Sequence, residues 1–179
     1  MRVTVFGGST PKALDAEYQE ALQLGILLAE AGHTVLTGGY MGTMEAVSRG
    51  ASEADGHVIG VTSNEIEAWR PGKPNAWIKE ELRFKSAHER LIALVEQCDA
   101  AIALPGGAGT LAEIAALWKH MIISSPRPFI IVGPKWDPVF KSLFTNLAEH
   151  ITSKDRDLLS FAPNIHAAVD LLQLPLVKS

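Results

Sequence analysis

The sequence has little of what marks a secreted or membrane protein. Its one cysteine, Cys98, cannot form a disulfide within the chain, which is compatible with a reducing compartment. The first residues, Met1 to Gly7, enter a strand pattern directly and leave no room for a secretory signal. No apolar run approaches the roughly 20 residues that a bilayer-spanning helix needs. We therefore expect a cytoplasmic protein with no membrane partner.

An excess of positive charge is also absent. The 16 Lys and Arg residues are outnumbered by 20 Asp and Glu residues, and the net charge of -4 argues against a nucleic-acid groove. The sequence has no HExxH pattern and no paired CxxC, and its six histidines are dispersed, so we expect no metal site. Backbone amides and one arginine are still enough to bind a single phosphate in an acidic protein.

The chain does contain a regular alternation of short apolar runs and longer segments with helical spacing. This alternation predicts an α/β fold, a three-layer doubly wound parallel sheet of the Rossmann-like type. With 179 residues we expect a single domain spanning 1–179. The predicted strands are Val3 to Phe6, Thr34 to Thr37, His57 to Val61, Ala100 to Leu104 and Phe129 to Val132.

Several residues mark predicted helix ends. Thr10 and Pro11 resemble an N-cap and a first helical residue, with Gly32 just past the end of that helix. Ser86 with Glu89 three residues later predicts a capping box that opens a helix to about Gln97. A further helix is expected at about 139–149, and a last one opens at Asn164. The segment from 62 to 85 has little periodicity beyond a possible short strand near Leu82. One interpretation is a surface connection, and the other is a functional segment that forms a pocket wall or an interface.

The most informative segment joins an apolar run to a glycine turn and then to a helical pattern. It reads Leu104-Pro105-Gly106-Gly107-Ala108-Gly109-Thr110-Leu111-Ala112-Glu113. Glycines let backbone N–H groups approach a ligand closely, and the next helix begins with unsatisfied N–H groups and a positive dipole end. Together these features favour an anion such as phosphate, so the segment predicts a nucleotide or sugar-phosphate pocket.

Two other predicted strands also end in glycine, at Gly7-Gly8-Ser9 and at Gly38-Gly39. In a parallel sheet these ends share one edge, where open α/β sheets bind ligands. Each glycine pair is a weak signal by itself, since such pairs also make turns without a ligand. The GxGxxG fingerprint is absent after the first strand, and so is the Walker A pattern, which argues against dehydrogenases and P-loop ATPases.

The segment Pro105 to Glu113 resembles the PGGxGTxxE signature of the LOG (Lonely Guy) family. His88-Glu89-Arg90 matches the upstream arginine helix of that family, and Gly38 to Met44 looks like a variant of its second glycine turn. The resemblance extends from Val3 to about Leu147. It implies a Rossmann-like fold of the SLOG type and a homodimer with active sites near the subunit boundary.

The resemblance further implies a phosphoribohydrolase that cleaves a nucleoside 5′-monophosphate, such as AMP or N6-modified AMP, into base and ribose 5-phosphate without a cofactor. Arg90 and Glu113 would be catalytic. The residues implied to bind phosphate and substrate are Gly8, Ser9, Gly39, Gly106, Gly107, Gly109 and Thr110. An older family name, lysine decarboxylase, is disfavoured because that reaction normally needs pyridoxal phosphate on a lysine, and nothing in the sequence identifies such a site.

Three alternatives remain open from the sequence. Thr110 and Glu113 also fit a capping box, and Arg90 fits a surface ion pair at a helix start. The same superfamily includes proteins thought to carry nucleotide-like ligands, among them molybdenum-cofactor carriers. An interaction module with a vestigial pocket is the third possibility.

Overall fold

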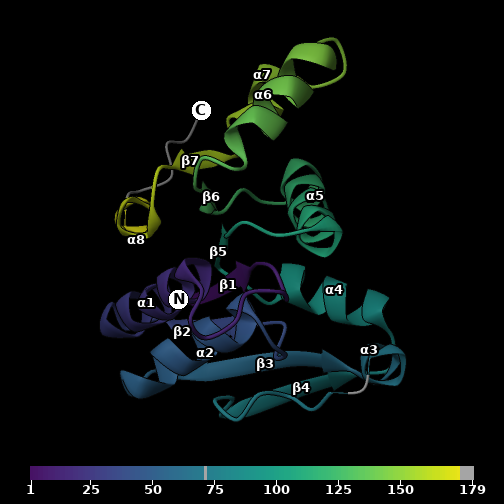
Figure 1. Ribbon diagram of the computed structural model, residues 1–179. Coiled ribbons are helices and arrows are strands. Elements are labelled where there is room, and N and C mark those ends of the chain that lie inside the picture. Colours follow the sequence, from purple (N-terminus) through teal and green to yellow (C-terminus); the bar gives the residue numbers. More distant parts are fainter. Residues whose placement is uncertain (71, 174–179) are drawn as a thin grey trace.

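The computed structural model of the chain describes residues 1–70 and 72–173, and within these ranges seven parallel strands form one sheet (Figure 1). The strand order is β4-β3-β2-β1-β5-β6-β7, so the winding direction reverses between β1 and β5. This arrangement confirms the predicted doubly wound α/β fold. The strands are β1 (Arg2–Phe6), β2 (Thr34–Thr37), β3 (Val58–Ser63), β4 (Glu80–Phe84), β5 (Ala100–Ala103), β6 (Phe129–Val132) and β7 (Ser160–Ala162). The expected single domain extends into residues 174–179, which lie outside the described residues.

Helices cover both faces of the sheet. Figure 1 shows α1, α2 and α8 on one face and α4 and α5 on the other. The helices are α1 (Ala16–Glu30), α2 (Thr43–Glu53), α3 (Asn64–Trp69), α4 (Ala87–Glu96), α5 (Ala108–Ile123), α6 (Asp137–Asn146), α7 (Ser153–Arg156) and α8 (Ile165–Leu172). Across the described ranges, no helix combines the length and the apolar character required to cross a membrane.

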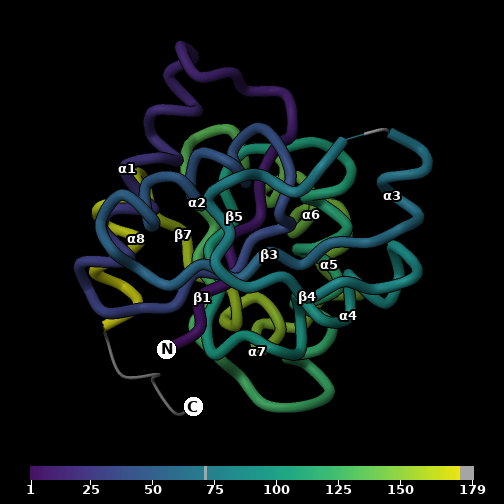
Figure 2. Tube along the Cα trace, turned by 90° about the horizontal axis from the view of Figure 1, so that it is seen from below, coloured from purple at the N-terminus to yellow at the C-terminus, as the bar shows by residue number. Residues whose placement is uncertain are grey.

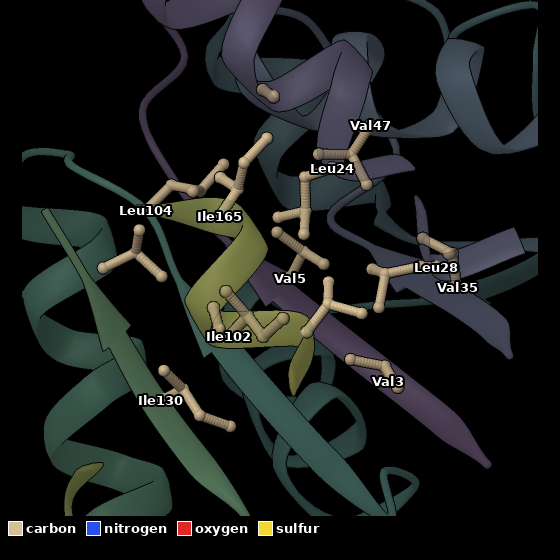
Figure 3. Packing of buried hydrophobic residues seen from close by; sticks show 14 of the residues in the cluster. Val3, Val5, Leu24, Leu28, Val35, Val47, Ile102, Leu104, Ile130 and Ile165 are labelled. Carbon is tan, nitrogen blue, oxygen red and sulfur yellow. The ribbon is translucent and has the colours of Figure 1, made fainter. Parts of the chain in front are cut away.

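Side chains alternate between two apolar clusters, one on each face. Val3 and Val5 of β1 and Ile102 of β5 pack against α1, α2 and α8, as Figure 3 shows for Leu24, Val47 and Ile165 among others. Phe6 of β1 and Ala101 and Ala103 of β5 join the opposite cluster with α4, α5 and α6. Central strands buried on both faces explain why the sequence shows continuous apolar runs at these positions.

The predicted helix ends are confirmed in three places. Ser86 and Glu89 form the capping box that opens α4, and the Asn164 side chain accepts from the Ala167 N–H at the start of α8. Gly32 follows α1 with φ of 75°, a conformation that glycine adopts without strain. The short strand predicted near Leu82 is β4.

The predicted start of the first helix is wrong. The α1 helix begins at Ala16 with Asp15 as its N-cap, five residues after Thr10. The Asp15 carboxylate accepts from the Lys12 N–H at 2.8 Å, and the Asp15 N–H donates back to the Lys12 carbonyl oxygen at 2.8 Å. This local turn competes with helix over residues 12–15. The elements α3, α7 and β7 were not predicted, because each is six residues or shorter and shows no clear period.

Candidate active site at the carboxyl edge of the sheet

Three glycine turns, which follow β1, β2 and β5, meet around Gly8. The Gly8 N–H donates to the Pro105 carbonyl oxygen at 3.2 Å and joins the turns after β1 and β5. The Gly8 carbonyl oxygen accepts from the Thr43 N–H at 2.9 Å and from the Thr43 hydroxyl at 3.0 Å, which brings in the turn after β2. The predicted convergence of three turns on one edge is thereby confirmed. In Figure 2 the loop after β1, drawn in purple, projects furthest from the molecule.

The turn after β5 leads directly into α5, whose N-cap is Gly107. The first N–H groups of the helix have no partner within it and lie at the positive end of its dipole. A Cβ atom built on Gly107 or Gly109 would enter open space, with no atom within 4 Å apart from those of its own turn and helix backbone. At Gly106, by contrast, a Cβ atom would overlap the hydroxyl of Thr110, whose side chain is buried. The outer rim of this turn is therefore open, while its inner side is packed by Thr110.

Arg90, near the start of α4, has a side chain that is only 9% exposed. Its Nε donates to the Val61 carbonyl oxygen at 2.7 Å, and its Nη2 donates to the Gly38 carbonyl oxygen at 3.0 Å. Its guanidinium also lies 5.6 Å from the ring centre of Tyr40. Arg90 thus connects α4 to the carboxyl ends of β2 and β3, so the interpretation as a surface ion-pair residue is wrong.

Glu113 lies further along α5 and faces Arg90. Its Oε1 is 3.8 Å from Nη1 of Arg90, and its side chain is 14% exposed. A capping box would need Thr110 at the N-cap, but the helix already begins at Ala108 and no side chain caps it. The alternative role of Glu113 as a helix cap is therefore excluded by the helix boundary.

The electrostatics of this pair follow from burial. Burial raises the pKa of Glu113 to about 7, against the opposing effect of the Arg90 charge. Burial also lowers the pKa of Arg90, although the Glu113 charge opposes the change. The distance of 3.8 Å exceeds that of a hydrogen bond, so this contact leaves the carboxylate oxygens able to accept from a ligand hydroxyl or a water.

Gly39 and Ser9 line the same edge of the sheet. Gly39 has φ of 78°, and its carbonyl oxygen accepts from the Asn75 N–H at 2.9 Å, which ties the segment after α3 to the glycine turn. The Ser9 hydroxyl accepts from Nη1 of Arg70 at 3.2 Å. Arg70 was not among the predicted site residues. It belongs to the aperiodic segment from 62 to 85, where no local pattern distinguishes it from a surface residue.

The fold and this glycine-lined edge define a Rossmann-like protein of the SLOG class. The model of the SLOG cluster4 family matches residues 1–135, and the chain belongs to this family. Its membership of the LOG family, indicated by the motif at Pro105 to Glu113, is confirmed by curated relatives.

Two of these relatives come from Oryza sativa subsp. japonica. A protein named probable cytokinin riboside 5′-monophosphate phosphoribohydrolase LOGL5 is 42% identical over 130 residues, covering 68% of this chain and 50% of that protein. The chain thus spans half the length of this relative. A second, named cytokinin riboside 5′-monophosphate phosphoribohydrolase LOG, is 32% identical over 175 residues, covering 94% of this chain and 71% of that protein.

Among solved structures, the molybdenum cofactor binding protein from Rippkaea orientalis has a similar fold. The TM-score is 0.76 at 26% identity, and the match covers 96% of this chain and 94% of that one. Fold similarity thus extends to a protein whose name describes binding, while the curated relatives are named as hydrolases.

Proposed function

We propose that the protein hydrolyses the N-glycosidic bond of a nucleoside 5′-monophosphate, AMP or N6-modified AMP, to the free base and ribose 5-phosphate. The observation that carries this proposal is the buried Glu113 carboxyl beside Arg90, at the edge of an open glycine turn. A buried carboxyl with a raised pKa beside a specific charged partner is typical of a functional group, and a helix cap does not explain it here. The names of the relatives support the same activity.

The turn at Gly107 and Gly109 is the proposed site of the 5′-phosphate. Since a Cβ atom at either position would enter open space, packing does not require glycine there. A phosphate that approaches the backbone N–H groups at the start of α5 does require it. Binding energy from this non-reacting group would position the scissile bond. We propose that Gly8, Ser9, Gly39, Gly106 and Thr110 shape the surrounding walls.

In the proposed reaction the bond between C1′ and the base nitrogen breaks, and its electron pair leaves with the base. Positive charge develops on the ribose, and the ionised Glu113 carboxylate stabilises it. A water adds its oxygen to C1′ and gives a proton to Glu113, while solvent supplies the proton that the base nitrogen takes up. Arg90 holds Glu113 in place and balances its charge in the buried site.

The test is to incubate the purified protein with AMP, with prenylated AMP and with adenosine, and to look for free base by chromatography. We expect base from the two monophosphates. The variant Glu113→Gln should lose turnover while it largely keeps phosphate binding. The matched control, Glu149→Gln, alters a carboxylate that is 81% exposed and should behave as wild type. Full activity of Glu113→Gln would refute the proposed mechanism.

Carriage of a nucleotide or of molybdenum cofactor is the second candidate, favoured by the fold shared with the Rippkaea orientalis protein. It predicts tight binding and no release of base from any substrate. Calorimetry with AMP and with molybdopterin, run beside the turnover assay, separates the two functions. If neither turnover nor saturable binding occurs, the protein is an interaction module instead.

We also propose that the protein forms a homodimer through α4 and α5. Four apolar side chains are exposed on these helices: Ile92, Leu111, Ile122 and Ile123, of which Ile123 is 74% exposed. Between the helices lies a hollow of about 210 Å³ whose walls include Glu96 of α4 and Lys119 of α5. A two-fold axis can bring the acid of one copy near the base of the other. Light scattering should give twice the 19.3 kDa chain mass, and Ile123→Glu should reduce it to the monomer mass. A monomeric wild type at micromolar concentration would refute this interface.

A further inference from the structure

Arg70 reaches from the end of α3 to the turn after β1. Its Nη1 donates to the Ser9 hydroxyl at 3.2 Å, although the two residues are 61 positions apart. Its guanidinium carbon lies 5.8 Å from the ring centre of Trp69, a side chain that is 78% exposed. Since Ser9 follows Gly8, around which the glycine turns meet, Arg70 places a cation beside these turns.

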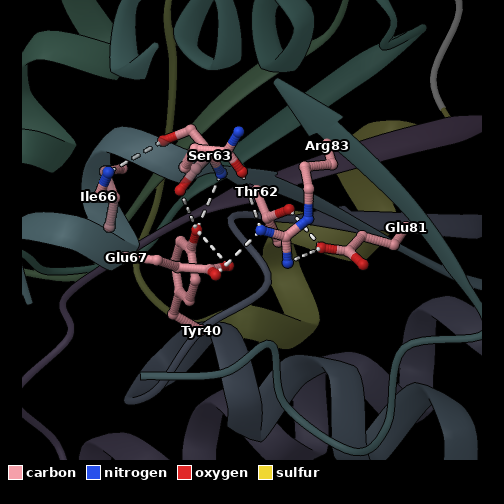
Figure 4. Close-up of polar contacts among 8 residues, drawn as sticks. Tyr40, Thr62, Ser63, Ile66, Glu67, Glu81 and Arg83 are labelled. Atoms are coloured by element: carbon pink, nitrogen blue, oxygen red, sulfur yellow. Dashed lines mark hydrogen bonds and ion pairs between the residues drawn. The ribbon is translucent and has the colours of Figure 1, made fainter. Parts of the chain in front are cut away.

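The α3 helix that carries Arg70 is held in place by polar contacts at its other residues. Glu67 accepts from Nη1 of Arg83 at 2.9 Å, and the Tyr40 hydroxyl lies 3.4 Å from the same carboxylate and accepts from the Ser63 N–H at 2.9 Å (Figure 4). At the end of the helix the Arg70 N–H donates to the Ile66 carbonyl oxygen at 2.9 Å. These contacts fix the backbone from which the Arg70 side chain extends, while its guanidinium lies at Ser9.

The two arginines of this edge differ in how their charges are balanced. Arg90 is already engaged by two carbonyl oxygens and by Glu113. Arg70 forms no ion pair with any acidic residue of the described ranges, and its hydrogen bond to Ser9 involves a neutral acceptor. The turn from Pro105 to Thr110 supplies N–H donors but contains no lysine or arginine. The cation that would balance a dianion bound at this turn must therefore come from elsewhere.

We propose that Arg70 binds the 5′-phosphate of the substrate from beside the turn after β1 and makes the site selective for nucleoside monophosphates over nucleosides. This inference rests on the proposed function, since it assigns the phosphate of the same site a second binding group. A phosphate oxygen is a stronger acceptor for a guanidinium than the neutral Ser9 hydroxyl, because the bond is then charge-assisted at both ends. The phosphate would lie between Arg70 and the N–H groups that open α5.

The test measures the binding of ribose 5-phosphate, AMP and adenosine by calorimetry, together with KM and kcat for AMP. Arg70→Gln should weaken the binding of both phosphates and raise KM by about tenfold or more, the usual effect of losing one charge-assisted contact, and should leave adenosine binding unchanged. Arg70→Lys should lose less, because the charge remains. The matched control is Lys73→Gln, which removes the same charge from an exposed position three residues away and should bind all three compounds as wild type does.

Equal binding of ribose 5-phosphate by Arg70→Gln and Lys73→Gln would overturn the inference. An equal loss for AMP and adenosine would do the same, since it would show a general distortion of the site, which thermal unfolding of each variant would also report. A wild-type protein that binds no phosphate compound refutes the inference as well. If the wild type binds ribose 5-phosphate through Arg70 but releases no base from AMP, the proposed hydrolysis fails and the assignment of Arg70 stands.

Discussion

Replacing Glu113 by glutamine tests directly whether this carboxyl is held in a buried, unfavourable environment. The carboxyl has an ordinary pKa of 4.5, which burial raises to about 7 in the folded protein, against the opposing charge of Arg90. Between these two values the folded chain binds more protons than the unfolded chain. The free energy of unfolding must therefore fall as the pH rises through this window.

The size of this effect follows from the two pKa values. Each pKa unit is worth about 1.4 kcal/mol, so the full penalty for ionising Glu113 in the folded state is about 3 kcal/mol. Between about pH 5 and pH 8 the wild type should lose about 2 to 3 kcal/mol of stability from this group alone. A typical domain has about 5–15 kcal/mol in total, so the loss is well within what denaturation curves resolve.

The assay is urea unfolding of wild type, Glu113→Gln and the control Glu149→Gln across this pH range. Glutamine does not titrate, so we expect the extra pH dependence to vanish in Glu113→Gln and to persist in the control. In parallel, kcat/KM for AMP should rise with pH through a midpoint near 7, because the ionised carboxylate is the active form. The reasoning would be refuted if the free energy of unfolding changed with pH to the same extent in wild type and Glu113→Gln. The carboxyl would then have the same pKa in the folded and the unfolded chain.

Three further predictions concern the scaffold of the site. Gly109→Ala should raise the free energy of unfolding by about 0.5–1 kcal/mol, because alanine favours helix. It should also weaken AMP binding in calorimetry, because its Cβ atom occupies the open rim of the turn. Unchanged affinity would mean that the phosphate binds elsewhere. Gly38→Ala would place a Cβ atom on Nη2 of Arg90. Thermal unfolding should therefore occur at a lower temperature, and kcat/KM for AMP should fall. Wild-type values for both would show that Arg90 is free to shift. Ser86→Ala removes the capping box of α4 and should cost about 1 kcal/mol in urea unfolding without changing KM for AMP; a raised KM would mean that the α4 terminus controls the position of Arg90.

Much of the fold could be predicted because its strands are buried on both faces. The runs at Val3 to Phe6 and Ala100 to Leu104 are apolar since helices cover each side of the sheet, and the caps at Ser86 and Asn164 are local signals that tertiary packing did not override. The start of α1 was misplaced because Thr10 and Pro11 match a helix start locally. The competing turn at Asp15 is also local but was not recognised.

The site was harder to predict because its decisive contacts are not local. Glu113 and Arg90 were selected through a motif, yet only the position of α5 relative to α4 separates their pairing from a capping box or a surface ion pair. Arg70 has no motif, and its contact with Ser9 joins residues 61 positions apart. Such a residue can be recognised only once the end of α3 is seen beside the turn after β1.

The glycines of this edge show how the requirements of folding and of binding can be separated. Gly38 is needed because Arg90 packs against it, and Gly106 because Thr110 does, so these two would be required in a protein that bound nothing. Gly107 and Gly109 meet no such requirement, since a side chain at either residue would enter open space. Gly109 also lies inside α5, where a glycine costs stability relative to alanine. Neither packing nor a positive φ accounts for that cost, but close approach of a ligand to the backbone does. The rim of the turn, rather than its packed inner side, is therefore the part of the motif that argues for phosphate.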